Sequence, residues 1–193
     1  SHSTTLYDAL RRNGSIATFL IRNEQAGAFA ADGYARVTGN PGVICTTAGP
    51  GATNALTGIA EAWADSIPLF LLAGQVNADR MEQECGAYHE IDLEGIFRPV
   101  TKWCRTVREV EAIPALIRDA FGAMTQGRPR PVALFLPQDL LRLETAWREP
   151  PDSPPAPVSP VPAGAIAAAA TLLGRAERPI VLAGGGALRS GAA

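Results

Sequence analysis

The chain carries no large excess of charge of either sign, no long apolar run and few cysteines, and each shortage excludes a class of function. Its 17 basic and 19 acidic residues give a formal net charge of −2. No basic surface for nucleic acid or for an anionic membrane is therefore expected. No apolar stretch is long enough to span a bilayer, and no signal peptide opens the sequence. We expect neither a nucleic-acid partner nor a membrane partner.

The three cysteines, Cys45, Cys85 and Cys104, are an odd set without the CxxC spacing of a redox or zinc site. Two of them fall in predicted strands. Reduced thiols in a protein core fit this pattern better than disulfides or metal ligands, so we expect a cytoplasmic protein without a metal site of its own.

What the chain has in abundance is hydrophobic residues, 47% of the total. The pattern predicts strands at 16–21, 43–46, 69–73, 103–107, 132–136 and 179–183. It predicts helices at 4–12, 24–38, 52–64, 93–97, 110–125 and 163–176. Continuously apolar strands that alternate with helices indicate an α/β fold, a three-layer parallel sheet with helices on both faces.

Composition divides this pattern into three parts. Residues 1–148 form the first α/β domain, which opens on a helix where a strand is usual, so a leading strand is expected to be absent. Residues 149–162 are rich in proline and predict an extended linker. Residues 163–193 are expected to be the truncated start of a second α/β domain. The opening Ser1-His2-Ser3 is either a cloning remnant or a native loop.

One carboxylate, Glu24, stands where a predicted buried strand meets a helix of small and apolar residues. Ligands of open α/β sheets bind beyond the carboxyl ends of the strands, which is where this carboxylate falls. A glutamate held there can share a proton with a basic heterocyclic nitrogen. The alternative is structural, because an acidic residue in the first turn of a helix stabilises the helix dipole and Asn23 is a good N-cap.

A second segment, TTAGPGATNA at 46–55, also follows a strand and opens a helix. Pro50 falls in the first helical turn, and Gly49 and Gly51 permit close approach of a backbone or a ligand. The segment matches neither the Walker A pattern nor GxGxxG. By itself it indicates either a tight turn or a ligand site.

Several motifs occur in one order at natural spacings: EQ at 24–25, ADGYAR at 31–36, AGPGATN at 48–54, ADSIP at 64–68, AGQ at 73–75, RPVTKW at 98–103, RPV at 130–132 and LPQD at 136–139. Together they resemble the N-terminal, pyrimidine-binding domain of thiamine-diphosphate enzymes of the acetolactate synthase, pyruvate oxidase and benzoylformate decarboxylase group. The linker and residues 178–186 resemble the start of that group's central domain. The resemblance covers essentially the whole chain.

The resemblance implies the thiamine-diphosphate-binding fold and makes Glu24 the catalytic residue that hydrogen-bonds N1′ of the cofactor's aminopyrimidine and so promotes loss of the thiazolium C2 proton. It implies that Gly49, Pro50, Gly51 and Asn54 line the pyrimidine side and the contact between subunits of a homodimer or tetramer. In this group the diphosphate and Mg²⁺ bind a separate domain with a Gly-Asp-Gly motif, which this sequence lacks. The chain alone is therefore expected to be inactive.

Two departures leave the reaction open. Many relatives have histidine where this chain has Asn23, and Tyr88-His89-Glu90 replaces the Phe-Gln-Glu of acetolactate synthases. Tyr88 and His89 either contact substrate or belong to a solvent-exposed loop.

The resemblance implies a 2-oxo acid or aldehyde as substrate. The candidates are an acetolactate synthase-like enzyme, a benzaldehyde-lyase-like carboligase and a 2-oxo-acid decarboxylase. A non-catalytic nucleotide-binding or assembly module is the alternative of another class. Some members bind FAD in the central domain, which nothing in this sequence supports.

Overall fold

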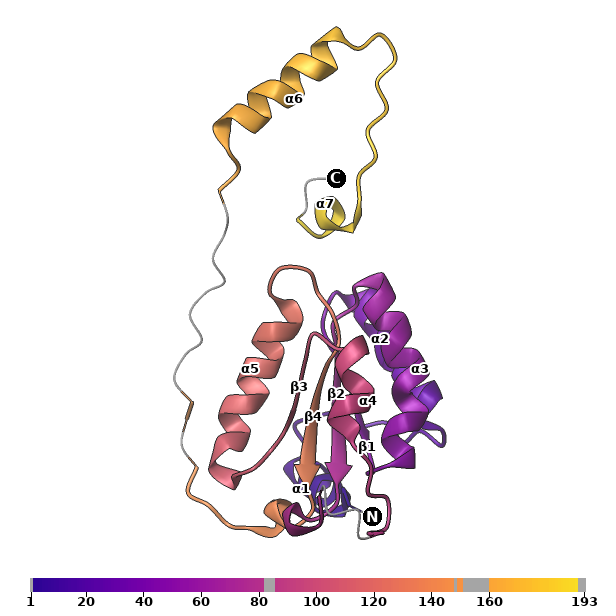
Figure 1. Ribbon diagram of the computed structural model, residues 1–193, viewed down its shortest axis with the longest axis vertical. Coiled ribbons are helices and arrows are strands. Elements are labelled where there is room, and N and C mark those ends of the chain that lie inside the picture. The colour runs from indigo at the N-terminus through magenta and orange to yellow at the C-terminus, as the bar shows by residue number, and fades with distance from the viewer. Residues whose placement is uncertain (1, 82–85, 148, 151–159, 191–193) are drawn as a thin grey trace. The chain divides into compact units, whose positions relative to one another are not determined.

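The computed structural model of the chain describes residues 2–81, 86–147, 149–150 and 160–190 (Figure 1). The chain forms two compact units, Ser1–Ser153 and Pro154–Ala193. Cys85 lies outside the described residues, whereas Cys45 and Cys104 are free thiols. Burial raises the pKa of the Cys45 thiol to about 11, so this thiol is protonated at neutral pH.

The first unit is built on a parallel sheet of four strands in the order β1-β2-β4-β3. The strands are β1 (Gly42–Thr46), β2 (Leu69–Gln75), β3 (Trp103–Thr106) and β4 (Val132–Pro137). Every residue of β4 is buried, as expected of a strand that is paired on both edges and covered on both faces. Four of the predicted strands are thereby confirmed.

Helices cover both faces of this sheet (Figure 1). They are α1 (Thr4–Asn13), α2 (Glu24–Thr38), α3 (Pro50–Asp65), α4 (Leu93–Phe97) and α5 (Ile113–Thr125), with 3-10 turns η1 (Ala78–Arg80), η2 (Arg98–Val100), η3 (Val110–Ala112) and η4 (Leu140–Arg142). Alternate residues of β2 point to opposite faces: Leu71 packs in a cluster with α2, α3 and α4, and Phe70 packs in another with α5. The predicted three-layer α/β fold is confirmed.

The helices α2 and α3 approach each other closely because small residues face one another. A Cβ added at Gly58 would lie 2.6 Å from the Cβ of Ala28, so only glycine fits at this crossing. An ion pair fixes the same two helices. The guanidinium of Arg36 contacts the buried Asp32 of its own helix at 2.6 Å and Asp65 of α3 at 2.8 Å. The ion pair joins the carboxyl ends of α2 and α3, and the crossing at Gly58 holds the two helices together closer to their starts.

The predicted buried strand at 16–21 is wrong. The segment is irregular and exposed, with Phe19 84% and Leu20 97% accessible. A strand forms only where a neighbour completes its hydrogen bonds, and the ladder of β1 runs to β2 alone. Ile21 is still anchored, because its side chain lies 3.6 Å from the position a Cβ would take on Gly27.

The second unit contains α6 (Ala163–Arg175) and α7 (Gly185–Arg189), so the predicted helix at 163–176 is confirmed to within one residue. The predicted strand at 179–183 is wrong, since this segment forms no ladder and Ile180 is 94% exposed. The physical reason is the same, because no neighbouring strand pairs with it among the described residues. Within the described parts of both units, no helix is both long and apolar enough to cross a membrane.

Candidate functional site

The carboxylate of Glu24 stands at the first residue of α2, where the sequence places it. The capping role suggested for this turn belongs to Asn23, whose Oδ1 accepts a hydrogen bond of 3.0 Å from the backbone N–H of Ala26. Because Asn23 occupies the N-cap, the Glu24 side chain is free to turn toward α3. Glu24 is half-buried there.

Asn54 of α3 orients this carboxylate. Its Nδ2 donates a hydrogen bond of 3.2 Å to Oε2 of Glu24, which joins residues 30 positions apart in the sequence. The other oxygen, Oε1, faces the glycine-containing turn, because a Cβ added at Gly51 would lie 3.4 Å from it. One carboxylate oxygen is therefore fixed by an amide, and the other lies beside Gly51, where a Cβ would also meet the methyl group of Thr47 at 2.6 Å.

Gly49 joins the same site to the loop that carries Tyr88 and His89. Its backbone is left-handed, with φ of 57°, and a Cβ added there would lie 2.7 Å from the carbonyl oxygen of His89. Glycine is therefore required both for its conformation and for the close approach of the loop. Pro50 follows as the first residue of α3 and is exposed. The structure thus brings Glu24, the glycine-containing turn and His89 to one place.

His89 has a strained backbone and a buried ring nitrogen without a hydrogen-bond partner among the described residues. Its φ of 72° is left-handed, which is costly for a residue with a side chain. Tyr88 stacks on its ring at a centroid distance of 3.8 Å. Nδ1 of His89 is buried and has no hydrogen-bond partner among the described residues. Such strain and such an unpaired nitrogen occur together most often at functional sites.

The N-terminal segment also contacts the carboxyl end of β1, close to this site, which the sequence did not predict. Ser3 Oγ donates to the carbonyl of Thr46 at 2.6 Å, and Tyr7 Oη donates to the carbonyl of Cys45 at 3.2 Å. The ring of His2 lies 5.6 Å from the ring of His89. The segment read as a cloning remnant or a loop thus supplies side chains to the site, and no spacing in the sequence signals this.

Two pKa shifts reflect this crowding. Burial, followed by electrostatic interactions with Cys45 and Glu24, raises the pKa of Tyr7. Burial, followed by the positive charge of His89, lowers the pKa of His2. Both shifts favour the neutral form. At neutral pH, Tyr7 and His2 are therefore uncharged neighbours of the carboxylate and of His89.

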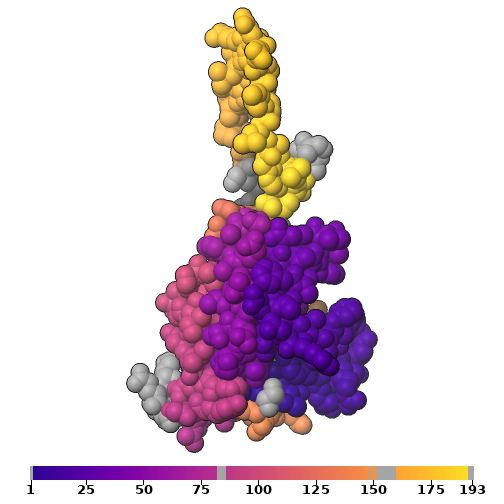
Figure 2. All heavy atoms as spheres, turned by 90° about the vertical axis from the view of Figure 1, so that its right-hand side faces the viewer, coloured from indigo at the N-terminus to yellow at the C-terminus, as the bar shows by residue number. Residues whose placement is uncertain are grey.

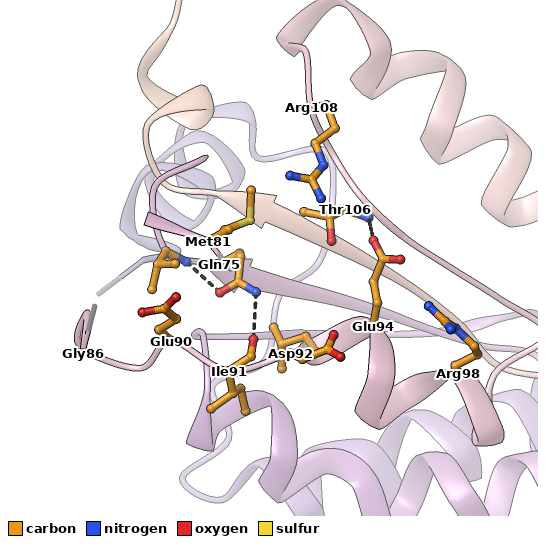
Figure 3. A pocket seen from close by; sticks show the side chains of 12 residues that line it. Gln75, Met81, Gly86, Glu90, Ile91, Asp92, Glu94, Arg98, Thr106 and Arg108 are labelled. Atoms are coloured by element: carbon orange, nitrogen blue, oxygen red, sulfur yellow. Dashed lines mark hydrogen bonds between the residues drawn. The ribbon is translucent and has the colours of Figure 1, made fainter. Parts of the chain in front are cut away.

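A cavity of about 700 Å³ has Glu90 in its lining (Figure 3). Gln75 ends β2 at its wall, where it donates to the carbonyl of Ile91 at 3.4 Å. Glu94 accepts a hydrogen bond of 2.7 Å from the backbone N–H of Thr106 at the end of β3. The lining also includes Met81, Asp92, Arg98 and Arg108. None of Glu24, Gly49 and Asn54 lines this cavity, so it is a separate hollow at the same edge of the sheet.

The Glu24 carboxylate suits a ring nitrogen of a planar heterocycle. It is half-buried and supplies a hydrogen-bonding group, and Asn54 holds one of its oxygens. No group of three potential metal ligands from His, Cys, Asp and Glu occurs in the part of the chain that the structure describes. The carboxylate can therefore hydrogen-bond a ring nitrogen of an aminopyrimidine, whereas the described residues supply no cluster of metal ligands.

Comparison with known proteins agrees with this geometry. Residues 1–96 match the family described as thiamine pyrophosphate enzyme, N-terminal TPP binding domain. The chain is 43% identical over 191 residues to the acetolactate synthase isozyme 3 large subunit of Escherichia coli, a match that covers 96% of this chain and 33% of the relative. It is 41% identical over 191 residues to the acetolactate synthase large subunit of Buchnera aphidicola, with the same coverage.

An archaeal relative gives a similar result. The probable acetolactate synthase large subunit of Methanocaldococcus jannaschii is 44% identical over 194 residues, which cover 96% of this chain and 32% of the relative. The chain thus spans about a third of the length of the curated relatives that it matches.

Proposed function

Because the chain belongs to the thiamine pyrophosphate enzymes, whose N-terminal TPP binding domain it carries, we propose that it is the cofactor-activating part of an acetolactate synthase-like enzyme acting on 2-oxo acids. The observation that carries the proposal is the Glu24 carboxylate, held by Asn54 beside the glycine-containing turn that begins α3. When bound, thiamine diphosphate supplies the carbon nucleophile that attacks the substrate carbonyl.

The proposed role of this chain is to bind the aminopyrimidine ring and to share a proton with it. Glu24 at the start of α2 is placed to hydrogen-bond the N1′ nitrogen of the aminopyrimidine and to share a proton with it. Asn54 restrains Oε2, which leaves Oε1 for the ring nitrogen. Gly49 and Gly51 let the loop of His89 and the side chain of Thr47 pack against this turn, which together with Pro50 is proposed to line the ring.

Tyr88 and His89 are proposed to face the substrate. The strained backbone of His89 and its contact with Gly49 support a role beyond that of a solvent-exposed loop. Since 2-oxo acids and aldehydes both present a carbonyl, the same site accommodates a benzaldehyde-lyase-like carboligase or a 2-oxo-acid decarboxylase. The identity to acetolactate synthases over nearly the whole chain favours 2-oxo acids.

Turnover of pyruvate by the enzyme that contains this chain tests the proposal. We expect release of CO₂ and formation of acetolactate only when thiamine diphosphate and Mg²⁺ are both supplied. Cleavage of benzoin, with no consumption of pyruvate, would favour the carboligase instead. If none of these substrates turns over in the presence of the cofactor, the enzyme proposal is wrong.

We also propose that the diphosphate and its Mg²⁺ are bound by a part of the enzyme outside this chain. The support is that no group of three potential metal ligands occurs among the described residues. A cytoplasmic location is proposed as well, because the thiols of Cys45 and Cys104 are free.

A homodimer, or a larger even assembly, is proposed to form through α2 and α3. The face of the molecule in Figure 2 is built largely from the first third of the chain, to which these helices belong. On α2, Phe29 is 40%, Tyr34 52% and Val37 87% exposed, and the preceding segment exposes Phe19 and Leu20. Apolar side chains gathered in this way are typical of a contact surface.

The substitution Phe29→Glu is expected to shift the assembly toward monomers, because a carboxylate on this face opposes burial of α2 in a subunit contact. Static light scattering measures the change. Leu143→Glu, which places the same charge at a 55% exposed site outside the two helices, should leave the mass unchanged. A strict monomer at high concentration of the unaltered protein, or an unchanged mass for Phe29→Glu, would contradict this interface.

A further inference from the structure

Two histidines, His2 and His89, meet beside the carboxyl end of β2 with ring nitrogens that the fold does not use. Their ring centres lie 5.6 Å apart, and the rings are tilted by 40°. Nδ1 of each ring is buried and has no hydrogen-bond partner among the described residues. A buried polar atom without a partner costs free energy, so two of them at one place indicate a ligand that both nitrogens bind.

Both histidines are held in place by close contacts with the backbone of a glycine. A Cβ added at Gly74 of β2 would lie 2.9 Å from Cβ of His2, so the N-terminal segment packs directly on this strand. The hydrogen bond of 2.6 Å from Ser3 Oγ to the last carbonyl of β1 fixes the same segment. A Cβ added at Gly49 would lie 2.8 Å from Cβ of His89. The two rings are therefore already together, which reduces the entropy lost when both bind one ligand.

The spacing of the two rings is that of imidazoles bound to one metal ion. A Zn–N bond of about 2.0–2.1 Å places the centre of each imidazole about 3.2 Å from the ion, so two rings at a tetrahedral angle lie about 5–5.5 Å apart. The 5.6 Å between His2 and His89 agrees with this separation. Tyr88 stacks on His89 with ring centres 3.8 Å apart, and this contact with the face of the ring leaves the lone pair in the ring plane for a metal.

Imidazole ligands decide which metals suit this pair. They favour Zn²⁺, Cu²⁺ and Ni²⁺, whereas Mg²⁺ prefers oxygen ligands, so the pair is distinct from the Mg²⁺ site of the cofactor. The part of the chain that the structure describes brings no third His, Cys, Asp or Glu to the two rings. The remaining positions around the ion therefore fall to water, as at an open zinc site.

We propose that His2 and His89 form a binding site for a divalent transition-metal ion such as Zn²⁺. The ion ties the N-terminal segment to the loop of His89, close to Glu24. The two histidines are far apart in the sequence and lack the spacing of a metal motif, so the sequence predicted no such site. Binding requires only the two imidazoles, so this site does not depend on the function proposed above.

Titration with Co²⁺, a coloured substitute for Zn²⁺, tests the site in the enzyme that contains this chain, with Mg²⁺ in excess. We expect saturable binding with the visible absorption of imidazole-bound cobalt, and displacement of the cobalt by Zn²⁺. His2→Gln and His89→Gln should each weaken this binding by about tenfold or more, because each removes one of two ligands. Tyr88→Phe keeps the stacked ring and both imidazoles, so it should leave the affinity unchanged.

X-ray absorption of the cobalt-loaded, unaltered enzyme needs no variant and should show two imidazole nitrogens around the ion. The proposal is wrong if fewer than two are found, or if no saturable binding of cobalt occurs. Unchanged affinity in either folded glutamine variant would also overturn it. So would displacement of the cobalt by Mg²⁺ at equal concentration, since that result assigns the site to oxygen ligands.

Discussion

Replacing Glu24 with glutamine is expected to lower kcat of the enzyme that contains this chain by about 10²- to 10⁴-fold, the usual range for loss of a proton-transferring group. The amide has the same shape, so Asn54 and the small residues behind it still pack against it. It cannot share a proton with a ring nitrogen as a carboxylate does. Steady-state turnover of pyruvate with saturating cofactor measures the loss.

The matched control is Glu61→Gln, which removes an exposed carboxylate from the C-terminal half of α3. This variant should retain turnover, and both variants should melt within a few degrees of the unaltered protein. If Glu24→Gln keeps full activity, Glu24 is a helix-stabilising residue and nothing more. If it loses activity together with its fold, Glu24 is needed for packing, and the loss of activity does not support a chemical role.

Gly49→Ala is expected to lower the free energy of unfolding by about 2–5 kcal/mol and to abolish turnover. A methyl group at this position meets the carbonyl oxygen of His89 at 2.7 Å, and the backbone φ of 57° disfavours any side chain. The loop of Tyr88 and His89 must therefore move away from Glu24. Urea denaturation and turnover measure the two effects.

Gly39→Ala is the control for backbone strain alone. Gly39 has a φ of 74° at the end of α2, but a Cβ there meets nothing within 4 Å. This variant should lose only about 1–2 kcal/mol and should keep its turnover. Equal stability losses for the two variants, with activity retained in both, would show that Gly49 serves the turn and not the approach of His89.

The fold was predictable where burial leaves a pattern within each strand and helix itself. The apolar runs that became β1, β2, β3 and β4 and the small-residue helices between them are visible in the sequence because each strand is covered on both faces. The segments at 16–21 and 179–183 carry the same apolar pattern but form no strand. Strand formation depends on a paired neighbour, which a local pattern does not report.

The site was predictable in part for the same reason. Glu24 and the glycine-containing turn were found because each stands at a helix start that the sequence marks. Their contact through Asn54 and the position of His2 beside His89 join residues far apart in the chain.

Exchange of the cofactor's C2 proton for deuterium tests the central claim, that Glu24 activates bound thiamine diphosphate, most directly. This rate is measured before any substrate reacts, so neither the identity of the 2-oxo acid nor product release affects it. The unaltered enzyme should exchange rapidly, and Glu24→Gln should exchange about 10²- to 10⁴-fold more slowly with the cofactor still bound. Equal exchange rates in the two proteins would contradict the account.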